Sequence, residues 1–194
     1  MMKIILASQS PRRKELMEAI TKDFEIIVSN ADEKLEEGLT LEEQAKNVSY
    51  QKAKAVFDRT EGDRIVIGSD TMVVKNNKIY GKPKTKEEAK EMVKMLKNTK
   101  HTVYTGLAIL EEKNGEYKEI LDCDTAQVYF GDMTEKEIED WVNSGEAMDK
   151  AGAYAVQGKF MVFIDKIEGN YQTVMGLPIH KVYEHLKKLG AIEN

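Results

Sequence analysis

The first half of the chain contains an apolar run that ends in polar residues, Arg64-Ile65-Val66-Ile67-Gly68-Ser69-Asp70-Thr71. A short apolar run bounded by turn-forming residues predicts a buried strand. We expect the strand to stop at residues 69–71, and the chain to continue extended from Met72 to Val74 as far as a turn at Asn76-Asn77. Because open α/β sheets present functional groups where strands end, Asp70 is a candidate ligand-binding residue.

Upstream of this run, the pattern predicts two further strands and two helices. The strands are expected at residues 3–7 and 24–28. The first helix should begin at Pro11 with Ser10 as its N-cap, because proline suits the first turn and serine satisfies a free N–H. The second follows Thr40-Leu41-Glu42-Glu43, which has the spacing of a capping box. The order βαβαβ indicates a parallel start to the sheet.

The middle of the chain predicts an antiparallel hairpin between two helices. Residues 101–110 and 117–130 are rich in strand-forming residues and flank an Asn114-Gly115 turn. Capping-box spacings at Thr85 with Glu88, and at Thr134 with Glu137, announce the two helices. Their expected core faces are Ala89, Met92, Val93 and Leu96, and Ile138, Trp141 and Val142.

The end of the chain predicts a strand near residues 160–167, a glycine-bearing loop over 169–176 and a helix from Pro178. We expect that helix to turn Ile179, Val182, Tyr183 and Leu186 inward. The whole pattern indicates an α/β fold, a mixed sheet flanked by helices, with a ligand cleft where polar loops gather. At 194 residues, 41% of them hydrophobic, the chain suits a single domain over 1–194, or two closely packed lobes.

Composition restricts the partners and the compartment. Because 29 Lys+Arg stand against 34 Asp+Glu, no broad electrostatic footprint for nucleic acid is expected, and an anionic ligand needs a local cationic cluster. The single cysteine, Cys123, excludes an internal disulfide and suits a reducing compartment, where we expect a buried structural thiol. Since no apolar run approaches the ~20 residues of a membrane span, we expect a cytoplasmic protein without membrane contact.

The segment Ser8-Gln9-Ser10-Pro11-Arg12-Arg13 combines two hydroxyls, a helix N-terminus and two guanidinium groups. Free backbone N–H groups and the helix dipole favour an anion, and arginine binds phosphate oxygens bidentately. The segment therefore predicts a phosphate site. An ordinary serine cap followed by solvated arginines explains the same residues.

Carboxylates and lysines give weaker signals. Asp70, with a second carboxylate from Asp32-Glu33, could hold Mg²⁺ together with substrate phosphates, although a turn cap and a solvated charge pair are the competing interpretations. Lys52 lies in the helix after Thr40, and Lys82 lies in Gly81-Lys82-Pro83, a stiff loop that could aim its ammonium group at a fixed point, but most lysines only solubilise a surface.

The remaining polar candidates are a glutamine and the histidines. Gln157, in a glycine-bearing segment, could read the edge of a pyrimidine base, with a structural turn as the alternative. His101, His180 and His185 lack metal-ligand spacing, and we expect them at the surface or at helix caps.

Taken together, eight short blocks resemble the Maf family in order along nearly the whole chain. They are Leu6 to Arg13, Asp32-Glu33, Gln51-Lys52-Ala53, Ile67 to Thr71, Gly81-Lys82-Pro83, Thr105-Gly106, Asp149 to Gly158 and Gly176-Leu177-Pro178. The resemblance implies a fold like that of inosine triphosphate pyrophosphatases, a long twisted mixed sheet with a cleft between two lobes. It implies hydrolysis of a surplus or non-canonical nucleoside triphosphate to the monophosphate and pyrophosphate, with Mg²⁺ or Mn²⁺. A homodimer is a further expectation of the resemblance.

Site roles follow from the resemblance position by position. Asp70 corresponds to the catalytic carboxylate, and Glu33 supports the metal with it. The phosphate-binding positions are Ser8, Ser10, Arg13, Lys52 and Lys82. Base preference falls to Arg12, Thr71 and Gln157, which resemble the branch acting on dTTP and UTP and not the one acting on 7-methyl-GTP.

We considered two alternative functions. The first is a nucleotide-binding regulator of cell division, which steady release of pyrophosphate would distinguish from an enzyme. A P-loop phosphotransferase is excluded because the chain has no G-x-x-x-x-G-K-[ST] motif.

Overall fold

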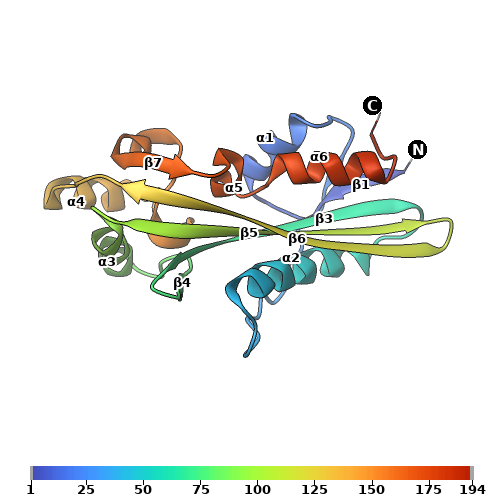
Figure 1. The fold of residues 1–194 in the computed structure, drawn as a ribbon, viewed down its shortest axis with the longest axis horizontal. Helices are drawn as coiled ribbons and strands as arrows, with labels where there is room; N and C mark the ends of the chain where they lie inside the picture. Colours follow the sequence, from blue (N-terminus) through green and yellow to red (C-terminus); the bar gives the residue numbers. More distant parts are fainter. Residues whose placement is uncertain (1, 193–194) are drawn as a thin grey trace. The chain divides into compact units, whose positions relative to one another are not determined.

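The structure is a computed structural model that describes residues 2–192 (Figure 1). The chain forms two compact units. Unit 1 contains the N-terminal part as far as Asp70, residues Thr105–Asp124 and the chain from Gly176 onward; unit 2 contains Thr71–Tyr104 and Thr125–Met175. In the described residues, no helix is both long and apolar enough to cross a membrane.

The strands form a mixed sheet, as predicted. Its hydrogen-bonded order is β2-β1-β3-β5-β6-β7, and β4 pairs with β3. In unit 1, β1 is parallel to both β2 and β3; in unit 2, the β3–β4 and β6–β7 pairs are antiparallel. The strands are β1 (Lys3–Leu6), β2 (Glu25–Ile26), β3 (Arg64–Lys75), β4 (Lys78–Tyr80), β5 (Lys100–Lys113), β6 (Glu116–Phe130) and β7 (Ile164–Glu168).

Three helices cover the strands of unit 1. The helices α1 (Pro11–Glu18) and α6 (Ile179–Lys188) lie on one side of these strands and α2 (Leu41–Phe57) on the other (Figure 1). The predicted N-caps are confirmed: Ser10 caps α1, and Thr40 with Glu43 forms a complete capping box on α2.

Alternation along β3 decides which side chains meet α2. Val66 belongs to the hydrophobic cluster under α2, together with Ile5, Ala7, Ala53, Val56, Phe57, Ala108 and Leu110. Since side chains alternate across a strand, Gly68 and Asp70 share the face of Val66, and Ser69 lies on the opposite face. Gly68 brings α2 very close, because a Cβ there would stand 2.3 Å from the Ser49 carbonyl oxygen.

Unit 2 packs α3 (Lys86–Leu96) against α4 (Glu135–Asn143). All seven core positions predicted on these helices are buried. The capping box at Thr134 is confirmed. The box at Thr85 is only half formed, because Thr85 accepts from the Glu88 N–H while the Glu88 carboxylate accepts from the Lys84 N–H.

The turns of both hairpins are as predicted. Asn114 and Gly115 have φ values of 52° and 80°, and Asn76 and Asn77 have φ values of 50° and 60°. Positive φ at two consecutive turn residues is the geometry of a type I′ turn, which matches the twist of the flanking strands.

Three details of the predicted elements were wrong. The strand does not stop at residues 69–71 but runs on to Lys75, because the backbone stays extended while polar partners satisfy Ser69 and Asp70. The predicted loop over 169–176 contains the short helix α5 (Tyr171–Met175). The predicted strand near 160–167 starts late, since a 3₁₀ segment, η2 (Gly158–Phe163), precedes β7.

Burial corrects three further expectations. His101 is buried, with its Nε2 2.7 Å from the Tyr154 hydroxyl, because it lies on the inward face of β5. Tyr183 is exposed, since Val182 and Leu186 define the buried stripe of α6 and Tyr183 lies a third of a turn away. Cys123 is half-buried, and desolvation raises the pKa of its thiol to about 12, so it is no nucleophile.

Candidate active site

The serine-arginine turn follows the carboxyl end of β1. Pairing with β3 ends at Leu6 opposite Ile67, and the Ala7 N–H still donates to the Ile67 carbonyl at 2.8 Å. The chain then turns, with the Ser8 hydroxyl accepting from the Ser10 N–H at 3.1 Å. The turn therefore places the N-terminus of α1 directly after the end of β1, while β3 continues beyond it.

Arg13 is held over this edge by two hydrogen bonds. Its Nε donates to the Gly176 carbonyl at 2.7 Å and its Nη1 to the Ser8 hydroxyl at 3.5 Å. Desolvation lowers the pKa of Arg13, while the negative charges of Asp70 and Glu33 oppose that shift. The guanidinium thus shares one electrostatic environment with both candidate carboxylates.

Lys52 lies between the two carboxylates. Its Nζ is 2.5 Å from Oδ1 of Asp70 and 3.1 Å from Oε1 of Glu33. The side chains of Lys52 and Asp70 are 10% and 16% exposed, whereas that of Glu33 is 48% exposed. Two of the three groups are therefore fixed inside the fold, and the third approaches from a surface loop.

The backbone of α2 explains where Lys52 lies. A Cβ on Gly106 of β5 would stand 2.0 Å from the Ala45 carbonyl oxygen, so α2 rests directly on the strands. At this distance the Ser49 hydroxyl accepts from the Asp70 N–H at 2.9 Å and donates to the Ala45 carbonyl at 2.7 Å. Lys52 follows one helical turn later and faces the Asp70 side chain.

Unit 1 thus brings together six of the predicted site residues, Ser8, Ser10, Arg13, Glu33, Lys52 and Asp70. Arg12 is half-buried on α1 and contributes to lowering the pKa of Arg13 by charge repulsion. Its guanidinium therefore belongs to the same electrostatic neighbourhood.

The other three predicted residues lie in unit 2. Thr71 follows Asp70 on β3, Lys82 is exposed in the loop after β4, and Gln157 is half-buried after η1 (Ala151–Ala153). The loop after β4 contacts η1, because the Gly152 N–H donates to the Gly81 carbonyl at 3.1 Å.

Sequence reasoning missed the residues that support the site from behind. The Ser69 hydroxyl donates to the carbonyls of Gly106 and Gly176 at 2.7 and 3.0 Å. Gly176 therefore joins Ser69 to Arg13. Two of the blocks singled out in the sequence contain Gly106 and Gly176, but only the structure shows that their carbonyls act as acceptors.

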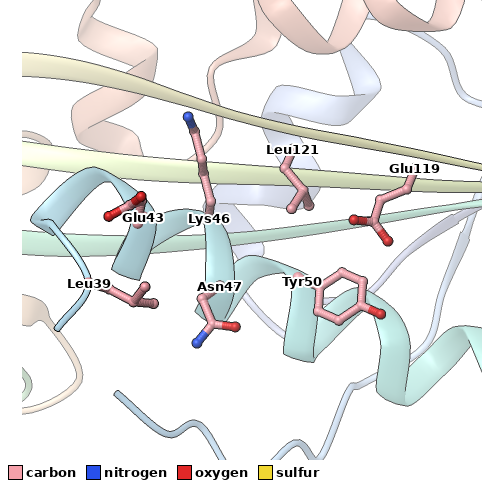
Figure 2. Close-up of a pocket in the computed structure, with 7 residues that line it drawn as sticks. All are labelled: Leu39, Glu43, Lys46, Asn47, Tyr50, Glu119 and Leu121. Carbon is pink, nitrogen blue, oxygen red and sulfur yellow. The ribbon is translucent and has the colours of Figure 1, made fainter. Parts of the chain in front are cut away.

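A separate pocket in unit 1 does not suit a triphosphate. Its lining combines two carboxylates with one ammonium group and does not include Lys52 (Figure 2). The lining residues are Leu39, Glu43, Lys46, Asn47, Tyr50, Glu119 and Leu121. Without an excess of cations, such a pocket repels a polyanion.

The chain resembles known proteins over nearly its whole length. The model of the family described as "Maf-like protein" matches residues 3–189. A protein of Alkaliphilus oremlandii named dTTP/UTP pyrophosphatase is 46% identical over 94% of this chain and 93% of its own length. A protein of that name from a Geobacillus species is 45% identical over 98% of this chain and 100% of its own.

Among solved structures, a HAM1 protein from Coxiella burnetii is 14% identical with a TM-score of 0.49, covering 97% of this chain and 100% of that one. The sequence match is much stronger than this structural one. It spans the serine-arginine turn, the Lys52 helix and the Asp70 strand in one alignment, and on that ground the chain belongs to the Maf-like protein family.

Proposed function

We propose that this protein hydrolyses nucleoside triphosphates between the α and β phosphates, releasing the nucleoside monophosphate and pyrophosphate, and that dTTP and UTP are its substrates. The observation that carries the proposal is the Lys52 bridge between Asp70 and Glu33, beside Arg13 and the N-terminus of α1. Relatives named dTTP/UTP pyrophosphatase over nearly their whole length support it.

A divalent cation, Mg²⁺ or Mn²⁺, fits the donor set of Asp70 and Glu33. Oxygens of both carboxylates lie within hydrogen-bond distance of a single ammonium nitrogen, so they already converge on one cationic point. Mg²⁺ usually takes one or two protein carboxylates and completes its shell with water and substrate phosphates. Within residues 2–192 there is no group of three or more His, Cys, Asp or Glu that could hold a metal alone, which favours such sharing. When bound, the cation would neutralise phosphate charge and lower the pKa of a coordinated water.

The protein's own groups then have distinct tasks. Lys52 binds Oδ1 of Asp70, so Oδ2 is the oxygen that would accept a proton from the attacking water or bind the cation. Arg13 and Lys52 offset the charge that develops on pyrophosphate, and the hydroxyls of Ser8 and Ser10 donate to phosphate oxygens. Positioned charge of this kind supplies most of the rate in phosphoryl chemistry. Lys82 is assigned to phosphate binding from its place in the sequence alone.

We assign the preference for a particular base to Arg12, Thr71 and Gln157, from their positions in the sequence. A glutamine amide offers both a donor and an acceptor, which suits the edge of a pyrimidine. Residence in the cytoplasm and a homodimer stay predictions. Clearing surplus or modified nucleotides from the pool is the physiological role that this chemistry supports.

The test is pyrophosphate release from a panel of dTTP, UTP, CTP, dATP, GTP and 7-methyl-GTP, with and without Mg²⁺. We expect steady turnover that needs Mg²⁺ and ranks dTTP and UTP first. Tight binding of these nucleotides without product would instead support the nucleotide-binding regulator, and preference for 7-methyl-GTP would overturn the base assignment.

A further inference from the structure

The loop that carries Glu33 has no regular structure of its own. Between β2 and α2 the backbone is irregular from residue 27 to 36, and Glu33 is about half exposed. Burial therefore does little to fix this carboxylate, although a metal-supporting role demands a defined position. Something else must hold the loop.

Gln51, the residue before Lys52, binds the backbone of this loop at the residue after Glu33. The Lys34 N–H donates to Gln51 Oε1 at 2.9 Å, and Gln51 Nε2 donates to the Lys34 carbonyl at 2.9 Å. One carboxamide thus satisfies both backbone groups of one residue, as a neighbouring strand would. The arrangement fixes the main chain regardless of the Lys34 side chain.

Gln44 repeats this arrangement two helical turns earlier on α2. Its Oε1 accepts from the Glu36 N–H at 3.1 Å, and its Nε2 donates to the Glu36 carbonyl. Residues seven apart lie on the same helix face, and alternate residues of an extended chain present their N–H and C=O groups to the same edge. The loop therefore lies extended along α2 and runs opposite to the helix.

We propose that Gln51, with Gln44 behind it, is a positioning residue that holds Glu33 against the Lys52–Asp70 pair. This inference rests on the proposed function. Because Gln51 and Lys52 are adjacent on one helix, the amide that binds the Lys34 main chain, next to Glu33, and the cation that pairs with the Glu33 carboxylate move together. The carboxylate is thus set in place before Mg²⁺ and substrate arrive.

The experiment compares Gln51→Met with Lys54→Met on the same helix. Methionine matches the length of glutamine, is one atom shorter than lysine and has a helix propensity similar to both, so each variant mainly removes a polar head group. Lys54 pairs with Asp58, four residues later on the same helix, and its side chain is 39% exposed. Two quantities are measured in each protein, the exchange rate of the Lys34 and Glu36 amide hydrogens and the Mg²⁺ concentration for half-maximal dTTP hydrolysis.

We expect Gln51→Met to speed exchange of the Lys34 amide by roughly tenfold or more, because its acceptor is lost. The Mg²⁺ requirement should rise by roughly tenfold, while kcat at saturating Mg²⁺ stays within about threefold. Gln51→Glu keeps the acceptor and loses the donor, so both effects should be intermediate. Lys54→Met should match the wild type.

Unchanged exchange at Lys34 in Gln51→Met would overturn the proposed contact. Faster exchange with an unchanged Mg²⁺ requirement would overturn the link between the contact and Glu33. If the wild type hydrolyses no triphosphate, the proposed function fails, whereas the exchange measurement still decides whether Gln51 holds the loop.

Discussion

Replacing Gly106 with alanine should force α2 away from the strands and disturb the site without touching a charged group. The new Cβ would lie 2.0 Å from the Ala45 carbonyl oxygen and 2.6 Å from the Ser49 hydroxyl, whereas real Cβ contacts are essentially never below 3.0 Å. The helix must therefore retreat by about 1 Å, since its backbone cannot rotate away as a side chain could.

The cost follows from what α2 buries. Its inner face includes Ala45, Val48, Ala53, Val56 and Phe57, and a gap of this size forfeits a quarter to a half of each dispersion contact. Overpacking usually costs ~1–3 kcal/mol and occasionally more, and we place Gly106→Ala at the upper end, at about 3 kcal/mol. For a protein of this length each kcal/mol lowers Tm by ~2–4 °C, so the expected fall is roughly 6–12 °C.

Thermal unfolding followed by circular dichroism measures the effect, with pyrophosphate release assayed below the transition. Gly131→Ala is the matched control, because its Cβ would meet only the Phe163 carbonyl at 3.7 Å, an ordinary contact. Activity of Gly106→Ala should fall at a temperature where the protein is still folded, since Ser49 and Lys52 move with the helix. A Tm within about 2 °C of the wild type would refute the close packing of α2.

Three further predictions test the site and the core. Asp70→Asn should lower kcat by at least ~10²-fold, the low end for a lost general base, and near-normal pyrophosphate release would contradict this role. His101 is buried and its pKa is lowered to about 3 from an ordinary 6.5, chiefly by desolvation. As pH falls from 6.5 toward 3 only the unfolded chain takes up this proton, so stability drops by up to ~1.4 kcal/mol per pH unit; His101→Gln should show a shallower decline in urea unfolding. Thr134→Ala should cost about 1 kcal/mol by removing the cap of α4, and an unchanged urea midpoint would count against the capping box.

Local rules predicted the elements of this fold well. Capping boxes, the Asn-Gly turn and the helical spacing of apolar residues concern groups a few positions apart, and Thr40, Thr134 and Asn114 behave as those rules require. The rules failed where distant groups decide the outcome. Residues 69–71 stay in a strand because the Ser69 hydroxyl finds the Gly106 carbonyl and the Asp70 N–H finds Ser49, partners that no local pattern reveals.

The candidate site was likewise predicted in part by local patterns and decided in part by distant groups. We expected Asp70 at the end of its own strand. Asp70 does lie where a strand of the sheet ends, but that strand is not its own. It is β1 that ends, opposite Ile67, while β3 continues through Asp70. The open edge beside a continuing strand is what lets Asp70 face both Lys52 and the serine-arginine turn.

The two carboxylates are held in place by different means. Asp70 is fixed by the main chain of β3, by Ser49 and by Lys52, all within a rigid helix-on-strand contact. Glu33 depends on one ion pair and on side-chain amides that hold a loop. Mg²⁺ demands near-ideal octahedral geometry, so the proposed metal site needs both carboxylates in defined positions. The fold meets this need at Asp70 through a strand and a helix, and at Glu33 through side-chain amides that hold the loop backbone.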